Sequence, residues 1–364
     1  MNFRDVSAKD AAALAKELEF HEPYREALTG RQLTECLLVL AKWDKDETCR
    51  RAGLSLAARL AGNDRLGESL DAQYVADCLS ALCTWEREPL CRAAGVRLAM
   101  RIATERSLCD ALDRQEIAGC LNALGRWHEE NACVAAGMRL AERIVHDQLL
   151  LQRLNGLAVS QCLNAFGKWH NKDICLHAGK QLARRLATDE TLVRQLNGVR
   201  VANCLGALGI WSKDDTCRAA GRRLAKRITE DGPLRHHLNA RHVAVCLNAL
   251  ANWSTDEVCR KAAVQLARRL SSDASICARL TAKHVGNCLK ALSKLSGEPA
   301  CRAVAIRLSQ RILTEETLFD EFDEQQIGMF AEALDAWGQE VLCVKAKTRL
   351  TNSCATSIAI AAPL

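Results

Sequence analysis

The chain has 364 residues, of which 49% are apolar, 26% charged and only 4% aromatic, and its net charge is +6. That apolar content can bury a large core, which argues against a disordered or low-complexity chain. No stretch approaches the roughly 18 uncharged apolar residues of a membrane helix, and charged residues interrupt the first twenty positions, so we expect neither a membrane span nor a secretory signal. The mild positive charge permits an acidic partner without requiring nucleic acid.

Tryptophan and cysteine recur along the chain with a period of 42 residues. The tryptophans are Trp43, Trp85, Trp127, Trp169, Trp211, Trp253 and Trp337, and Leu295 occupies the one skipped position. One cysteine column runs from Cys36 to Cys288 and a second from Cys49 to Cys343. Such a period is typical of HEAT and armadillo arrays, in which each unit buries its apolar face on its neighbours. We therefore predict an all-α fold, a right-handed superhelical solenoid formed by the whole chain, 1–364.

The predicted array begins with a terminal cap, residues 1–28. Within it Ala11 and Leu14 align with Gly53 and Leu56, as the second half of a unit would. Degenerate end units are expected of a solenoid. Because the chain opens on half a unit, we expect a fragment or a short relative of a longer protein. Eight 42-residue units are predicted over residues 29–350, followed by a tail at 351–364.

Each unit is predicted to hold two long helices and a short one. Helix A is illustrated by 239–253, where Asn239 is the expected N-cap and Val243 and Leu250 recur at helical spacing. The same capping position holds Thr29, Asp71, Asp113, Asn155, Asn197, Thr281 and Asp323. Helix B is illustrated by 256–270, with an acidic residue at its positive end. A brief third helix is expected before the next helix A, for example at 189–196.

Helix B carries a column of small residues. Its members are Gly53, Gly95, Gly137, Gly179, Gly221, Ala263 and Ala305. Glycine destabilises a helix by about 1 kcal/mol relative to alanine. Its recurrence therefore predicts that another backbone passes close to helix B.

The residues that usually carry chemistry favour packing instead. The chain has 19 cysteines, but the two columns fall at inward helix positions and no C-x-x-C pair occurs. His242 and Cys246, like His284 and Cys288, have metal-compatible spacing, yet each pair uses a cysteine of the core column. P-loop, G-x-G-x-x-G, H-E-x-x-H and G-x-S-x-G motifs are missing. We expect no catalytic residue, no metal and no cofactor, and a reducing compartment.

Arginines in helix B form a candidate ladder. They are Arg59, Arg101, Arg143, Arg185, Arg227, Arg269 and Arg311. Regularly spaced guanidinium groups could follow the phosphates of a polyanion. An acidic residue four positions on, such as Glu105 after Arg101, favours instead a structural clasp between units. Both roles remain open at this point.

Helix A holds the other candidate surface. Two of its columns vary from unit to unit while their neighbours stay constant, and variable positions on a fixed frame usually carry partner specificity. The alternative is that these positions are unconstrained solvent-facing residues. The candidate partner-binding residues are Asn122, Asn164, Asn203, Asn248, Asn287, Gln161 and Lys290, with Arg126 and Lys168 directly before two tryptophans.

The repeated pattern C-L-N-A-L-x-x-W followed by C-x-x-A-G-x-x-L-A-x-R resembles the SKWP repeats of type III secreted effectors of plant-pathogenic bacteria. The resemblance covers about 29–350, and ALSKLSGEPAC at 291–301 comes closest. Proline directly after tryptophan, part of that family's pattern, is missing here. The resemblance implies a non-catalytic scaffold that bacteria deliver into the host cell cytoplasm, where it binds host macromolecules.

Two kinds of partner stay open. The first is a host protein or peptide held along the concave face. The second is single-stranded RNA, read one base per unit as in octotricopeptide arrays. The mild charge and the scarcity of aromatic residues favour the protein. The sequence does not determine which helix lines the concave face or whether the chain self-associates.

Overall fold

The computed structural model describes residues 6–361, with side chains as far as residue 352. This part of the chain is helical and contains no β-strand, so the predicted all-α class is confirmed. Contacts between helices group the chain into two compact units, Met1–Leu182 and Ala183–Leu364. The division falls inside one helix, α13 (Asp173–Thr188). Each unit is described by itself.

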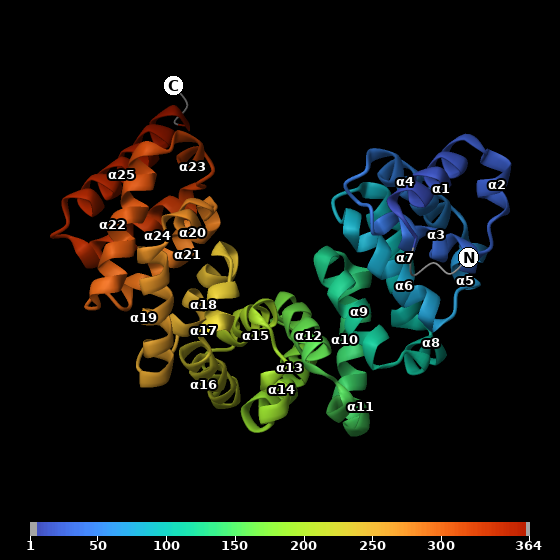
Figure 1. The fold of residues 1–364 in the computed structure, drawn as a ribbon, viewed down its shortest axis with the longest axis horizontal. Helices are drawn as coiled ribbons and strands as arrows, with labels where there is room; N and C mark the ends of the chain where they lie inside the picture. The colour runs from blue at the N-terminus through green and yellow to red at the C-terminus, as the bar shows by residue number, and fades with distance from the viewer. Residues whose placement is uncertain (1–5, 362–364) are drawn as a thin grey trace. The chain divides into compact units, whose positions relative to one another are not determined.

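The first unit contains a row of A helices and a row of B helices (Figure 1). The A helices are α3 (Gly30–Ala41), α6 (Ala72–Leu82), α9 (Arg114–Leu124) and α12 (Gly156–Lys168). The B helices are α1 (Ala8–Phe20), α4 (Glu47–Gly62), α7 (Pro89–Thr104) and α10 (Asn131–His146). The short elements are α2 (Glu22–Ala27), α5 (Asp64–Glu68), α8 (Arg106–Ala111), α11 (Gln148–Arg153), η2 (Cys83–Trp85) and η3 (Gly125–Trp127). Consecutive helices of each row pack side by side.

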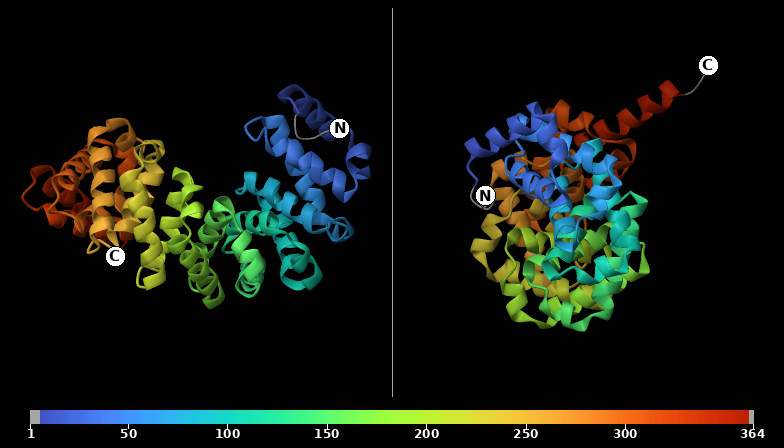
Figure 2. Two further views of the ribbon diagram at one scale, coloured as in Figure 1. Left: turned by 60° about the horizontal axis from the view of Figure 1, so that its bottom comes forward. Right: turned by 90° about the vertical axis from the view of Figure 1, so that its right-hand side faces the viewer.

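The second unit is built in the same way (Figure 2, left). Its A helices are α15 (Gly198–Ile210), α18 (Ala240–Ala251), α21 (Ala282–Ser293) and α24 (Glu324–Leu334). Its B helices are α16 (Asp215–Glu230), α19 (Glu257–Ser272), α22 (Pro299–Thr314) and α25 (Val341–Ala361). The short elements are α14 (Glu190–Arg194), α17 (Gly232–His237), α20 (Ala274–Ala278), α23 (Glu316–Asp320) and η4 (Asp335–Trp337). None of the helices in the described part of the chain combines the length and the apolar composition of a membrane span.

The predicted N-caps begin all eight A helices, and seven of them cap the helix through the side chain. Asn239 Oδ1, for example, accepts a hydrogen bond from the backbone N–H of His242 at 3.0 Å. The same arrangement occurs at Thr29, Asp71, Asp113, Asn155, Asn197 and Asp323. Thr281 is the exception, because its Oγ1 lies 2.7 Å from Nδ1 of His284 and makes no side-chain cap. Satisfying free N–H groups at a helix start stabilises it by about 1 kcal/mol.

The cores of both units consist of leucine, alanine and cysteine. Both cysteine columns are buried, as predicted. Burial raises the pKa of the Cys162 and Cys246 thiols to about 12, so these groups remain protonated. The 18 cysteines of the described region are all free thiols. Cysteine therefore acts in this fold as a small apolar side chain.

The glycine column contacts tryptophan rings, not a neighbouring backbone. A Cβ added at Gly53 would lie 2.5 Å from Cη2 of Trp85, and one added at Gly137 would lie 2.6 Å from Cη2 of Trp169. Real Cβ atoms do not approach other atoms so closely. The predicted close backbone is therefore wrong: glycine is required because the indole ring fills the place of a side chain.

Helices occupy both predicted end segments, the cap at 1–28 and the tail at 351–364. The predicted cap contains α1 and α2, and α1 packs on α4; residues 1–5 lie outside the described part. The predicted tail, 351–364, continues helix α25 as far as Ala361, and 362–364 lie outside the described residues. Alanine, threonine and serine without glycine or an early proline allow this continuation, since Pro363 comes only after the helix.

Candidate binding surface

The candidate partner-binding residues lie on the solvent side of the A helices. We call this side the A-helix face. In the first unit it includes Asn122 on α9 and Gln161 and Asn164 on α12, all half-buried, on two helices that pack together. In the second unit it includes Asn203 on α15, Asn248 on α18, and Asn287 and Lys290 on α21. Lys290 is exposed and the three asparagines are half-buried. Side chains so placed can contact a partner while their helix remains fixed in the row.

The two basic candidates next to tryptophans have different surroundings. Arg126, in η3, is exposed, and its Nη1 lies 3.0 Å from a carboxylate oxygen of Glu86. The following residue, Trp127, donates a hydrogen bond from Nε1 to the Glu86 carbonyl at 2.9 Å. Arg126 therefore belongs to the contact between successive tryptophan turns. Lys168 is exposed at the end of α12.

The arginine ladder is directed into the protein. Arg101 lies 2.7 Å from both carboxylate oxygens of Glu105 and donates to the carbonyls of Gly67 and Leu70 at 2.6 and 2.8 Å. Its side chain is only 13% exposed. The two carbonyls are at and just beyond the end of α5, where a cation is favourable. Arg101 thus fastens helix B to the preceding short helix.

Other members of the ladder make related contacts. Arg311 contacts Glu315 at 2.7 Å and donates to the carbonyls of Cys277 and Leu280 at 2.6 and 3.1 Å. Backbone carbonyls also accept from Arg59, Arg143 and Arg269, while Arg185 and Arg227 lie 3.6 and 3.8 Å from Asp189 and Asp231. Guanidinium groups engaged in this way have few N–H groups left for phosphate. The geometry favours the structural role over the polyanion ladder.

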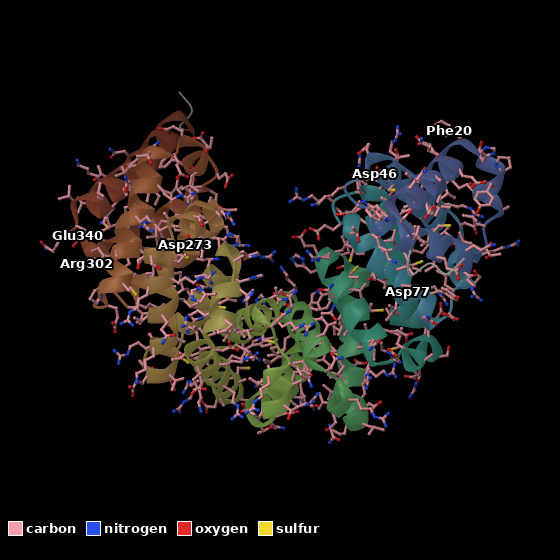
Figure 3. All side chains as sticks on the ribbon, viewed as in Figure 1. Phe20, Asp46, Asp77, Asp273, Arg302 and Glu340 are labelled. Atoms are coloured by element: carbon pink, nitrogen blue, oxygen red, sulfur yellow. The ribbon has the colours of Figure 1, made fainter. Side chains whose placement is uncertain are left out.

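A second series of ion pairs was missed by the sequence analysis. Each joins an arginine early in one B helix to the acidic residue that starts the next. Arg302 Nε lies 3.1 Å from a carboxylate oxygen of Glu340, and Figure 3 labels the two residues beside each other. The same pairing occurs at 2.6 Å for Arg50 and Glu88, at 3.9 Å for Arg92 and Glu130, and at 3.2 Å for Arg260 and Glu298. Each of these arginines directly follows a cysteine of the second column, which runs from Cys49 to Cys343. This recurrence is the sequence signal that could have predicted the series.

Neither histidine–cysteine pair has the surroundings of a metal site. Within the described region, no group of three or more His, Cys, Asp or Glu side chains could hold a metal ion. Burial, followed by the charge of Arg241, lowers the pKa of His242. Cys246, four residues after His242, is a buried thiol, and its raised pKa disfavours the thiolate that metals bind. The A-helix face presents amide and ammonium groups.

The comparisons with known proteins add nothing to what the chain's own residues indicate. No protein-family model matches the chain, and no curated protein matches it at a significant level. The A-helix face carries polar side chains that differ from unit to unit on helices that pack together. We therefore take it as the candidate functional site.

Proposed function

We propose that this chain is a solenoid of eight 42-residue HEAT/armadillo-like units and works as a non-catalytic scaffold that binds a protein or peptide through its A-helix face. The solenoid is supported by the sequence period, which passes unchanged from Trp169 in the first compact unit to Trp211 in the second. Within each unit, every A helix packs on the next A helix. Stacked units of this kind usually bind through an extended surface instead of one pocket.

The observation that carries the proposal is the contrast between the two rows. The columns of helix B that stay constant between units make contacts inside the protein. Arg101, for example, contacts Glu105 and two backbone carbonyls. The columns that vary between units, such as that of Asn122 and Asn164, reach solvent from a fixed frame. Side chains that serve packing are thus separated from side chains available for binding.

A peptide fits this face better than RNA. Asparagine and glutamine each offer both donors and acceptors, which suits the backbone of an extended or helical segment. Asn122, Gln161 and Asn164 present three such groups on two adjacent helices. Many RNA-binding surfaces also stack bases on exposed aromatic or arginine planes, and aromatic residues make up only 4% of this chain.

The proposed setting follows from the resemblance to SKWP effectors. It would place the protein in the cytoplasm of a host cell, where glutathione keeps thiols reduced. The buried free cysteines of both units suit that environment, because they pack as thiols and not as bridges. The proposed partner is therefore a host protein.

A peptide-display selection against the full chain tests the scaffold proposal. We expect selected peptides to lose about tenfold or more in affinity for the double variant Asn122→Arg/Asn164→Arg, because bulky cations would occupy the face. The matched control is Ala93→Arg/Ala135→Arg, which adds the same charge at exposed positions of α7 and α10. Equal loss in both variants, or no selectable peptide, would contradict the proposal. Salt-sensitive binding of mixed single-stranded RNA at this face would support the alternative.

A further inference from the structure

The A-helix face of the second unit carries a stripe of positive charge. We call Arg241 on α18, Lys283 and Lys290 on α21 and Lys294 at the C-cap of α21 the basic stripe. Its three lysines are spaced by seven and four residues, so they follow one side of α21 over about 16 Å. All four residues are exposed. The stripe therefore presents an ordered row of cations to solvent.

Contacts between α18 and α21 place the arginine beside the lysine row. At one end, Lys294 Nζ lies 2.9 Å from Oδ1 of Asn252, the C-cap of α18. At the other end, burial and then the charges of Arg241 and Lys283 lower the pKa of His284. The charge of Arg241 on α18 thus reaches the first turn of α21. The two helices present their basic residues as one surface.

No acidic side chain neutralises this surface. In the part of the chain that the structure describes, none of the four stripe residues forms an ion pair. In the first unit two cations at corresponding positions are paired, Arg31 with Glu35 and Arg126 with Glu86, each at 3.0 Å. Burial, followed by the charge of Lys290, lowers the pKa of Lys294. Adjacent like charges without a counter-ion repel each other, and a bound anion removes that repulsion.

The positions equivalent to the basic stripe are not basic on the two flanking A helices. On α24 the equivalent face carries Glu332, and Asp335 at its end pairs with Lys347. On α15 it carries the exposed apolar side chains of Val199 and Ile210. A nucleic acid that crossed the row of A helices would contact the basic stripe on only two of them. No Phe, Tyr or Trp lies between 240 and 252 or between 282 and 294 to stack on a base.

We propose that the basic stripe binds an acidic segment of the partner protein, laid along α21 with its carboxylates opposite the three lysines. This inference rests on the proposed function and names the chemistry of its partner in the second unit. Asn248 and Asn287 lie between the cations on the same face and can bond the segment's backbone. Opposite charges at this spacing speed association and fix the register of the segment.

Fluorescence anisotropy with defined probes tests the proposal on the full chain. The main probe is an alanine-based helical peptide with glutamates at the spacing of Lys283, Asn287, Lys290 and Lys294, and its control replaces every glutamate with glutamine. We expect only the acidic peptide to bind, with an affinity that falls as salt rises. The variant Lys283→Glu/Lys290→Glu/Lys294→Glu should weaken binding about tenfold or more. A uridine oligomer of similar length is the third probe.

A variant with the same change in charge controls for nonspecific attraction. Lys213→Glu/Arg268→Glu/Lys345→Glu alters three exposed residues of the second unit that form no ion pair in the described region, and it should bind like the wild type. Thermal unfolding checks that both variants fold. Equal weakening in both, equal binding of the glutamine peptide, or binding of the uridine oligomer alone would each overturn the inference. If the acidic peptide fails while selected peptides still depend on Asn122 and Asn164, only this inference fails and the scaffold proposal stands.

Discussion

Gly95 on α7 and Trp127 in η3 occupy one space between them: a Cβ added at Gly95 would lie 2.8 Å from Cη2 of the indole ring. The ring is also held at its other edge, where Nε1 donates to the carbonyl of Glu86 at 2.9 Å. The ring therefore cannot move away without losing a hydrogen bond. The one position without a tryptophan, Leu295, stands 32 residues after Ala263, as Trp127 stands after Gly95. Loss of the ring coincides there with loss of the glycine.

The first prediction is that the effect of Gly95→Ala changes sign with residue 127. In the wild type, the methyl group would press on the held ring, and we expect a loss of about 1–3 kcal/mol in the free energy of unfolding. In a Trp127→Leu background the ring is gone, so alanine should stabilise the helix by about 1 kcal/mol over glycine. Urea unfolding of the four proteins measures this coupling.

Gly119→Ala is the matched control for that cycle. Gly119 lies in the interior of α9, and a Cβ there would meet nothing within 4 Å. The substitution should therefore stabilise the protein by up to about 1 kcal/mol. Additive effects of Gly95→Ala and Trp127→Leu would show that the ring contact does not determine the glycine. Ala305 and Trp337 share the same register, so in that repeat a methyl group stands at the position that Gly95 holds in its own.

The second prediction concerns the clasp made by Arg101. Arg101→Lys keeps the positive charge but cannot contact the Glu105 carboxylate at two points and both carbonyls together. We expect a loss of about 1–3 kcal/mol in the free energy of unfolding. Arg106→Lys is the control, because the Arg106 side chain is 82% exposed and its Nε makes a single long contact of 3.4 Å with a carboxylate oxygen of Asp110. Its effect on the free energy of unfolding should stay within about 0.5 kcal/mol. Equal urea midpoints for the two variants would contradict the clasp.

The third prediction is a pH dependence of the same clasp. The hydrogen bond from Arg101 holds the pKa of Glu105 below its ordinary value of 4.5. A carboxyl with a lowered folded pKa stabilises the fold above the unfolded pKa, and this contribution is lost as the pH falls through the folded pKa. Wild type should therefore exceed Glu105→Gln in stability at neutral pH and converge with it below about pH 4.5. Because Glu105 is 39% exposed, solvent screens the pair and the difference should be modest.

Glu68→Gln is the control for this pH series, since Glu68 is exposed and forms no ion pair within the described region. It should track the wild type across the whole range. Thermal unfolding followed by circular dichroism at several pH values measures both variants. A constant gap between wild type and Glu105→Gln down to low pH would show that the loss is steric and not ionic.

The sequence predicts the helices well because their signals are local. The cap at Asn239 and the apolar spacing within 239–253 determine a helix before any tertiary contact forms. The neighbours of a helix are harder to predict, because a glycine column indicates a close contact without identifying the group that makes it. The offset of 32 residues from Gly95 to Trp127 also joins Ala305 to Trp337, so the contact in the structure, and not the spacing, identifies the ring.

The candidate surface shows a similar limit. Periodicity places Asn122 and Lys290 on the outer side of helix A, and the structure gives both solvent access. The sequence also supplies the charges of Arg241 and Lys283, but not their surroundings. Whether a cation is paired depends on side chains of neighbouring helices, as the contact of Arg126 with Glu86 demonstrates. The basic stripe therefore became visible only with the packing.

The last prediction is that nearly all thiols of the folded protein resist modification. Burial raises the pKa of Cys162 and Cys246 to about 12, and the thiolate, not the thiol, is the reactive form. In a Cys354→Ser background, which leaves only the described cysteines, we expect a disulfide reagent at mildly alkaline pH to react with one thiol, the half-buried Cys83. The others should react on unfolding in guanidinium. Cys83→Ser should abolish the native reaction, and rapid native labelling of several thiols would show that the cysteine columns open to solvent.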